Sequence, residues 1–191
     1  MATESKNIFD RLLDQLRCSD VFISYLERSH TNEMKFESPI EEMFGTAFVA
    51  VAPLRDLRLR IAHGCTLDDL QRISGRHDVA IASQVRVGGM RCDFGIVVWY
   101  RGEVVRTILV ECDGHEFHER TKAQAQKDKA RDRRLQCHGY SVLRFTGSEI
   151  WSDAVACAYE VCGLVEGDIV GAMFMASIND YAKQVEAGVH V

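Results

Sequence analysis

Two acidic residues that close an apolar stretch are the first candidates for chemistry. Glu111 and Asp113 follow Ile108, Leu109 and Val110. Because side chains alternate across a strand, Glu111 and Asp113 point to one side of it. Two carboxylates at the end of an apolar strand are costly unless a cation compensates their charge. The pattern predicts a cation site, and the alternative is an acidic strand end exposed to solvent.

The register between neighbouring strands decides whether Asp93 joins these carboxylates. A three-residue loop, Arg101 to Glu103, would pair Tyr100 with Val104 and set Asp93 opposite Glu111, with β-carbons roughly 4.5 to 5.5 Å apart. A two-residue loop would turn Asp93 to the other face. We adopt the three-residue loop. Carboxylates this close suit a hard cation, Mg²⁺ or Mn²⁺.

A basic helix is expected directly after the acids. Residues 119–134 carry seven basic side chains against three acidic ones, in a chain whose formal net charge is −5. The seven are Arg120, Lys122, Lys127, Lys129, Arg131, Arg133 and Arg134. Such a helix beside a metal suits a phosphodiester, because the bases hold the phosphate backbone. The alternative is a solvated helix in which Asp128 pairs with Arg131, and Asp132 with Lys129.

Two histidines, His115 and His118, stand at the start of this helix. Without a third nitrogen or sulfur ligand nearby, contact with phosphate or a structural hydrogen bond is favoured over metal binding. Together with Arg120, Lys127 and Arg131 they are the candidate nucleic-acid contacts.

Five pieces of the sequence resemble the PD-(D/E)XK nuclease superfamily, and more closely its branch related to very-short-patch-repair (Vsr-like) endonucleases, which contains many small bacterial proteins. They are Ser38-Pro39-Ile40-Glu41, Arg91-Cys92-Asp93-Phe94, Val110-Glu111-Cys112-Asp113-Gly114-His115, Arg131-Asp132-x-x-Leu135 and Gly139-Tyr140-Ser141-Val142-Leu143-Arg144-Phe145. The resemblance covers about residues 36–152, and the order and spacing of the five pieces make it fairly specific.

The resemblance implies a Mg²⁺-dependent DNA endonuclease or nickase. Asp93 and Glu111 would be the principal metal ligands and Asp113 a third, at the place where the superfamily most often has lysine. Lys122 is the candidate for the missing cation, and Gln84 a polar partner on the neighbouring strand.

Glu41 has two readings of about equal weight. With Ser38 as N-cap and Pro39 in the first helical position, Glu41 completes a capping box. In the resemblance it matches the helix glutamate that approaches the metal, with Glu42 as a substitute if the helix is rotated. Arg144, on the last strand, is expected to pair with a carboxylate or to reach a phosphate.

The order of elements indicates an α/β fold in which helices flank a mixed sheet of about four strands. The resemblance implies that this is a restriction-endonuclease-like core. Strands are expected over 77–87, 90–100, 103–112 and 140–145, and helices over 38–50, 54–62, 66–73, 119–138 and 148–151. The domains expected are a helical extension (1–35), the nuclease-like core (36–152) and a C-terminal helical segment packing on the core (153–191), mostly helical with glycine interruptions.

Composition narrows the class of protein. A chain of 191 residues with 47% hydrophobic and 27% charged residues fits one folded domain. No uninterrupted apolar run approaches the roughly 18 residues of a membrane helix, and seven irregularly spaced cysteines are a poor disulfide framework. We therefore expect a cytoplasmic protein that binds DNA and no membrane. The apolar tail covers the core or a second copy in a homodimer.

Two other functions stay open. One is a catalytically inert nucleic-acid or protein-binding module on the same scaffold, favoured by the acidic bulk and the missing lysine. The other is a small-molecule hydrolase that uses the same acidic site on a phosphate monoester or cyclic nucleotide.

Overall fold

The computed structural model describes residues 34–73, 77–114 and 122–186, with backbone alone for 122–125. The helical extension expected over residues 1–35 therefore lies almost wholly outside the described residues.

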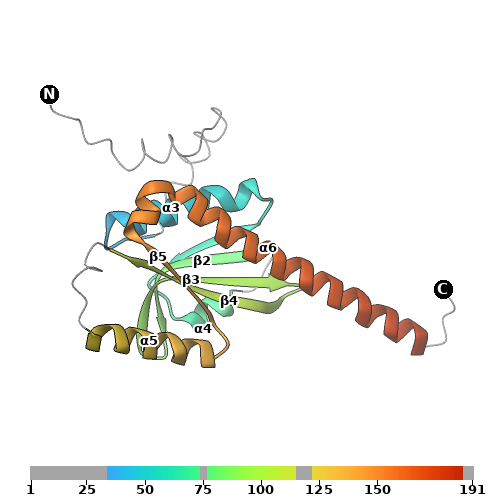
Figure 1. Ribbon diagram of the computed structural model, residues 1–191. Helices are drawn as coiled ribbons and strands as arrows, with labels where there is room; N and C mark the ends of the chain where they lie inside the picture. Colours follow the sequence, from blue (N-terminus) through green and yellow to red (C-terminus); the bar gives the residue numbers. More distant parts are fainter. Residues whose placement is uncertain (1–33, 74–76, 115–121, 187–191) are drawn as a thin grey trace.

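A five-stranded mixed sheet forms the centre of the molecule (Figure 1). Its strands follow the chain in spatial order: β1 (Leu59–His63), β2 (Val79–Val87), β3 (Met90–Tyr100), β4 (Glu103–Asp113) and β5 (Ser141–Thr146). The three central strands are antiparallel to one another, and each outer strand pairs in parallel with its neighbour. This is the α/β, restriction-endonuclease-like fold that the sequence predicts, with one strand more than expected.

The additional strand, β1, replaces a helix that was predicted over residues 54–62, and that prediction was wrong. The helix before it, α3 (Pro39–Leu54), continues four residues past its expected end. Asp56 then adopts a φ of 56°, which ends the helix. Arg58 binds Asp78 through its backbone N–H and its guanidinium, at 2.6 to 3.0 Å. This long-range pair sets β1 beside β2, and local sequence does not reveal it.

Helices cover both faces of the sheet (Figure 1). α3 and α6 (Gly147–Glu186) cover one face, and α4 (Leu67–Gln71) and α5 (Lys122–Cys137) the other. α6 departs from helical geometry at Asp153 alone and continues through the glycines that were expected to interrupt it.

Local sequence determines several helix ends. Ser38 caps α3 by accepting from the Glu41 N–H, and Thr66 forms a capping box with Asp69 on α4. α5 ends in the pattern typical of a left-handed glycine cap: Gly139 has a φ of 84°, and Tyr140 N–H donates to the Leu135 carbonyl. This cap returns the chain into β5, beside the acidic strand.

The β3–β4 hairpin turns on two residues, not on the three that were predicted. Arg101 and Gly102 both have positive φ, 51° and 85°, as in a type I′ turn. Tyr100 therefore pairs with Glu103 and not with Val104.

A β-bulge beside Trp99 nevertheless restores the predicted register between the two strands at the position of the carboxylates. The bulge shifts the ladder by one residue, so that Phe94 pairs with Val110. Continued by one residue, this register sets Asp93 opposite Glu111, the pairing that the sequence predicts.

An aromatic cluster joins α3 to the strands that carry the acids. The Phe44 ring lies 5.2 Å from that of Phe94 and 5.6 Å from that of Phe145, and Phe44 is fully buried. Packing of these rings fixes the helix that carries Glu41 against β3 and β5.

We expect Phe44→Ala to lower the free energy of unfolding by about 3–5 kcal/mol, because it removes a buried ring and leaves a cavity. Urea unfolding followed by circular dichroism measures this loss. Leu54→Ala, at a half-exposed position of the same helix, should change stability by no more than about 0.5 kcal/mol. Equal losses in the two variants would contradict the assigned core.

Candidate active site

Three elements bring carboxylates together at one end of the sheet. Glu41 comes from α3, Asp93 from β3 and Glu111 from β4. Glu41 and Glu111 are buried, and the charges of both raise the pKa of Asp93. The structure therefore gathers three of the predicted site residues, from positions that are 70 residues apart in the sequence.

Desolvation is the largest effect on Asp93. Burial raises the pKa of this carboxyl, the Cys112 N–H that donates to its Oδ2 at 2.7 Å lowers it, and Glu111 and Glu41 raise it further. The pKa of Asp93 reaches about 7, against an ordinary value of 3.8. Such a carboxyl is poised between a proton and a cation at neutral pH.

Glu41 is held by donors from its own helix start and from β2. Its Oε1 accepts from the Ser38 hydroxyl at 2.9 Å, and its Oε2 from the Glu37 N–H at 3.0 Å. Gln84 Nε2 donates to the same Oε2 at 2.7 Å. Glu41 therefore both caps the helix and faces the site. Gln84 contacts Glu41 and not Glu42.

Gln84 stands at a distortion of β2. Its φ is 56°, a value that costs a non-glycine residue about 1–3 kcal/mol. The apolar side chains change face here, since Ile81 packs with α3 and α6, and Val85 with α4 and α5. The distortion brings the Gln84 amide to Glu41 and leaves its buried Oε1 without a hydrogen-bond partner among the described residues. In the sequence, the only indication that Gln84 belongs to the site is its polar side chain within an apolar strand.

Arg131 on α5 neutralises Glu111. Its Nη2 lies 2.6 Å from Glu111 Oε1, and it also donates to the Arg91 carbonyl and lies 3.5 Å from Cys92 Sγ. Neither sequence reading placed Arg131 there, since it was expected to contact nucleic acid or to pair with Asp128. The sequence signal for this ion pair is the Arg131-Asp132 dipeptide, on a helix expected to follow an acidic strand.

Arg144 links β5 to two acids, as one of its sequence readings predicted. Its Nη1 lies 3.1 Å from both carboxylate oxygens of Asp113, and its Nε and Nη2 each lie 2.9 Å from Asp132. Asp132 therefore pairs with Arg144, not with Lys129 within its own helix. Through Arg131 and Arg144, α5 is tied to both acids at the carboxyl end of β4, Glu111 and Asp113.

Several predicted site residues are not placed. His115, His118 and Arg120 lie outside the described residues, as does the Lys122 side chain. Lys127 is exposed on α5.

No three His, Cys, Asp or Glu side chains in the described ranges form a ready-made metal site, although several oxygen donors meet here. Asp93, Glu111 and Glu41 offer carboxylate oxygens, and Gln84 offers a buried amide oxygen that has no hydrogen-bond partner among the described residues. Oxygen ligands and excess negative charge suit Mg²⁺. Binding would require Glu111 to share or release Arg131.

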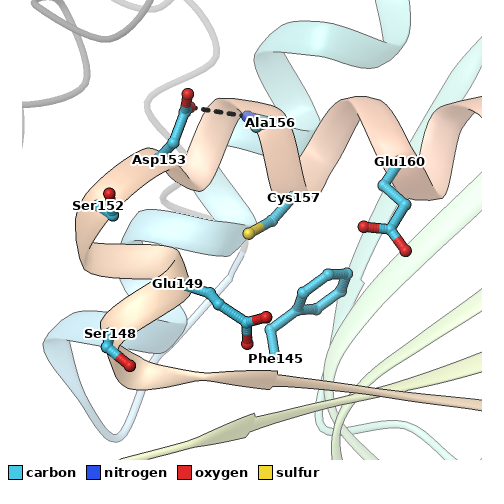
Figure 2. Close-up of a pocket in the computed structure, with 8 residues that line it drawn as sticks. All are labelled: Phe145, Ser148, Glu149, Ser152, Asp153, Ala156, Cys157 and Glu160. Carbon is cyan, nitrogen blue, oxygen red and sulfur yellow. Dashed lines mark hydrogen bonds between the residues drawn. The ribbon is translucent and has the colours of Figure 1, made fainter.

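A separate open hollow of about 460 Å³ lies over the first turns of α6. Figure 2 shows its lining: Phe145, Ser148, Glu149, Ser152, Asp153, Ala156, Cys157 and Glu160. None of the gathered carboxylates lines it, and its own acidic side chains, Glu149, Asp153 and Glu160, would repel a phosphate. It is therefore not part of the candidate site.

Comparison with known proteins finds one family match. Residues 70–163, just under half of the chain, match the model of a restriction-endonuclease-like family, REase_MTES_1575. The match supports the PD-(D/E)XK superfamily and suggests a nuclease. No curated protein matches the chain.

One solved structure shows a distant likeness, the crystal structure of HopZ1a in complex with IP6. Sequence identity is 15% and the TM-score is 0.30. The likeness covers 91% of this chain and 61% of the HopZ1a chain, so this chain spans less than two thirds of the length of HopZ1a. A likeness at this level carries no argument about fold or function.

The raised pKa of Asp93 makes stability depend on pH. The folded protein binds more protons than the unfolded chain between about pH 4 and pH 7, so this residue's contribution to the free energy of unfolding is lost as pH rises through about 7. Without divalent metal, wild type should therefore lose stability from about pH 5 to about pH 8, and Asp93→Asn should lose much less.

Urea midpoints in EDTA at the two pH values measure this difference. Glu160→Gln, an exposed acid in the separate hollow, should keep the fall of the wild type. The same fall in Asp93→Asn would show that the pKa of Asp93 is not raised.

Proposed function

We propose that this protein is a Mg²⁺-dependent DNA endonuclease or nickase of the Vsr-like branch, working in the cytoplasm. The observation that carries the proposal is the convergence of Glu41, Asp93 and Glu111 at one end of a restriction-endonuclease-like sheet. The family match over residues 70–163 supports the nuclease class.

Asp93 and Glu111 would hold the metal ion, with Asp113 as the third ligand and Gln84 Oε1 as a neutral one. A bound Mg²⁺ supplies charge neutralisation at the scissile phosphate and lowers the pKa of the attacking water. Glu41, fixed by Ser38 and Gln84, would orient that water by accepting a hydrogen bond from it.

The cation that the superfamily usually draws from a lysine must come from elsewhere, because Asp113 stands at that position. Lys122 is the candidate from sequence. Arg131 is a second candidate, because its guanidinium already contacts Glu111 and is partly exposed. If Glu111 bound a metal ion, Arg131 would be free to stabilise negative charge on a phosphate oxygen.

The outer side of α5 would contact the DNA backbone. Its exposed basic side chains include Lys127, Lys129, Arg133 and Arg134. His115, His118 and Arg120, in the preceding segment, are proposed to extend this contact. The contact is non-specific in kind, because charges that meet phosphates carry no sequence information.

Asp93→Ala and Glu111→Ala should each lower Mg²⁺-dependent plasmid cleavage by at least roughly 100-fold, because each removes a metal ligand. Glu160→Ala should cleave like wild type. Circular dichroism of each variant checks folding, and calorimetric titration with Mg²⁺ or Mn²⁺ checks metal binding. Retained cleavage in both site variants would overturn the assignment.

Substitution of the two candidate cations separates their roles. Arg131→Met should lower cleavage by roughly 10²–10³-fold if Arg131 stabilises the phosphate, and Lys122→Met should then have a small effect. Arg131→Met also leaves Glu111 unpaired, so stability in EDTA should fall by up to about 3 kcal/mol and recover with Mg²⁺. The opposite order of cleavage defects would assign the role to Lys122.

The inert binding module is the second candidate, and the Arg131–Glu111 ion pair favours it. Arg131 lies 2.6 Å from Glu111, the proposed metal ligand, and neutralises its negative charge without a metal ion. DNA binding that is unchanged by Asp93→Asn, with no heat of metal binding in wild type, would support the module.

A further inference from the structure

The second half of α6 runs beyond the body of the molecule (Figure 1). Val165 is the last buried residue of the helix. Ile169 still packs against the core, partly buried. Seven further apolar side chains are 45% to 65% exposed: Val170, Met173, Phe174, Met175, Ile178, Tyr181 and Val185. An exposed apolar surface of this extent marks an interaction site in a soluble protein.

Spacing along this half of the helix follows a heptad. Leu164, Gly167, Gly171, Phe174, Ile178, Tyr181 and Val185 recur at alternating intervals of three and four residues. All of them are exposed. This strict alternation over three heptads is typical of a coiled-coil seam. A helix that only packs on its own sheet would bury these positions.

Two glycines occupy contact positions of the seam. A β-carbon added at Gly167 or Gly171 would meet nothing within 4 Å in the described chain. Each glycine costs about 1 kcal/mol relative to alanine inside a helix, so both need a reason. Close approach of another helix provides one, because small residues let two helix backbones come together.

Acidic residues of this half are held by the protein's own arginines. Glu166 pairs with Arg55, Asp168 with Arg106 at 2.5 Å, and Asp180 with Arg101 at 3.2 Å. These pairs fix the rotation of the helix and turn its acids toward the core.

The positions that flank the seam are, apart from Asp168, uncharged: Val170, Met175, Ser177, Ala182 and Gln184. A homodimer brings identical flanks together, so charged flanks would repel one another. The uncharged flanks therefore suit a second copy of the chain and offer nothing to a partner of opposite charge.

We propose that α6, from Leu164 to Val185, pairs with the same helix of a second copy in a two-stranded coiled coil. The exposed apolar side chains of the seam, Leu164, Phe174, Ile178, Tyr181 and Val185, would be buried between the two helices. The inference does not depend on the proposed nuclease activity, because its residues lie away from the carboxylate site.

A membrane is the other occupant to consider. By length and composition α6 could cross one, with an 18-residue window of mean hydropathy 1.6 that is 17% buried. Insertion would, however, separate Asp168 and Asp180 from their arginines and place acids in lipid, which is costly. The second copy is therefore favoured.

Light scattering and sedimentation equilibrium of the full chain test the proposal. Wild type should show twice the chain mass of 21.5 kDa. The double variant Phe174→Glu, Ile178→Glu should be monomeric, because it places charges in the seam. Asn179→Glu adds one carboxylate beside Ile178, at an exposed position outside the seam, and should stay dimeric.

Far-ultraviolet circular dichroism and the melting temperature confirm that each variant folds. A monomeric wild type, or a double variant that remains dimeric, would overturn the proposal. Flotation of monomeric wild type with phosphatidylcholine vesicles would assign the seam to a membrane and overturn it as well.

Discussion

Buried negative charge at one end of the sheet is the constraint on which the arrangement of the molecule depends. Glu41, Asp93, Glu111 and Asp113 come from three elements, and water is largely excluded from them. Uncompensated carboxylates in such surroundings are costly, so the fold must bring donors or cations to them. Arg131 and Arg144 supply the cations that the structure shows, and backbone N–H groups and Gln84 supply the donors.

This compensation also explains how α5 is attached. The helix is strongly polar and contributes Leu135 to the core. Two ion pairs, Arg131 with Glu111 and Asp132 with Arg144, join it to β4 and β5. The interactions that neutralise the site thus hold in place the helix whose other face is basic. A ligand that displaces Arg131 from Glu111 would act on the site and on this attachment together.

The two halves of α6 have different roles for the same kind of reason. Up to Val165 the helix packs against α3 and completes the core. Beyond it, acids bind arginines of β4 and of the β3–β4 turn, while the apolar positions face away from the sheet. Burial explains most apolar positions of the first half. The second half has a fixed orientation and an exposed apolar seam, which the proposed partner helix would cover.

Local sequence determined the strands at 90–100 and 103–112, the latter one residue longer in the structure, and the caps at Ser38 and Thr66. Alternation, capping and turns act over a few residues, so they can be read locally. Tertiary structure decided the rest. β1 depends on the Arg58–Asp78 pair, and the register of the acids on a bulge that no local rule placed. The partners of Glu111 and Asp113 were chosen among many arginines by packing across the sheet, because an ion pair between distant residues forms only where the fold brings them within reach.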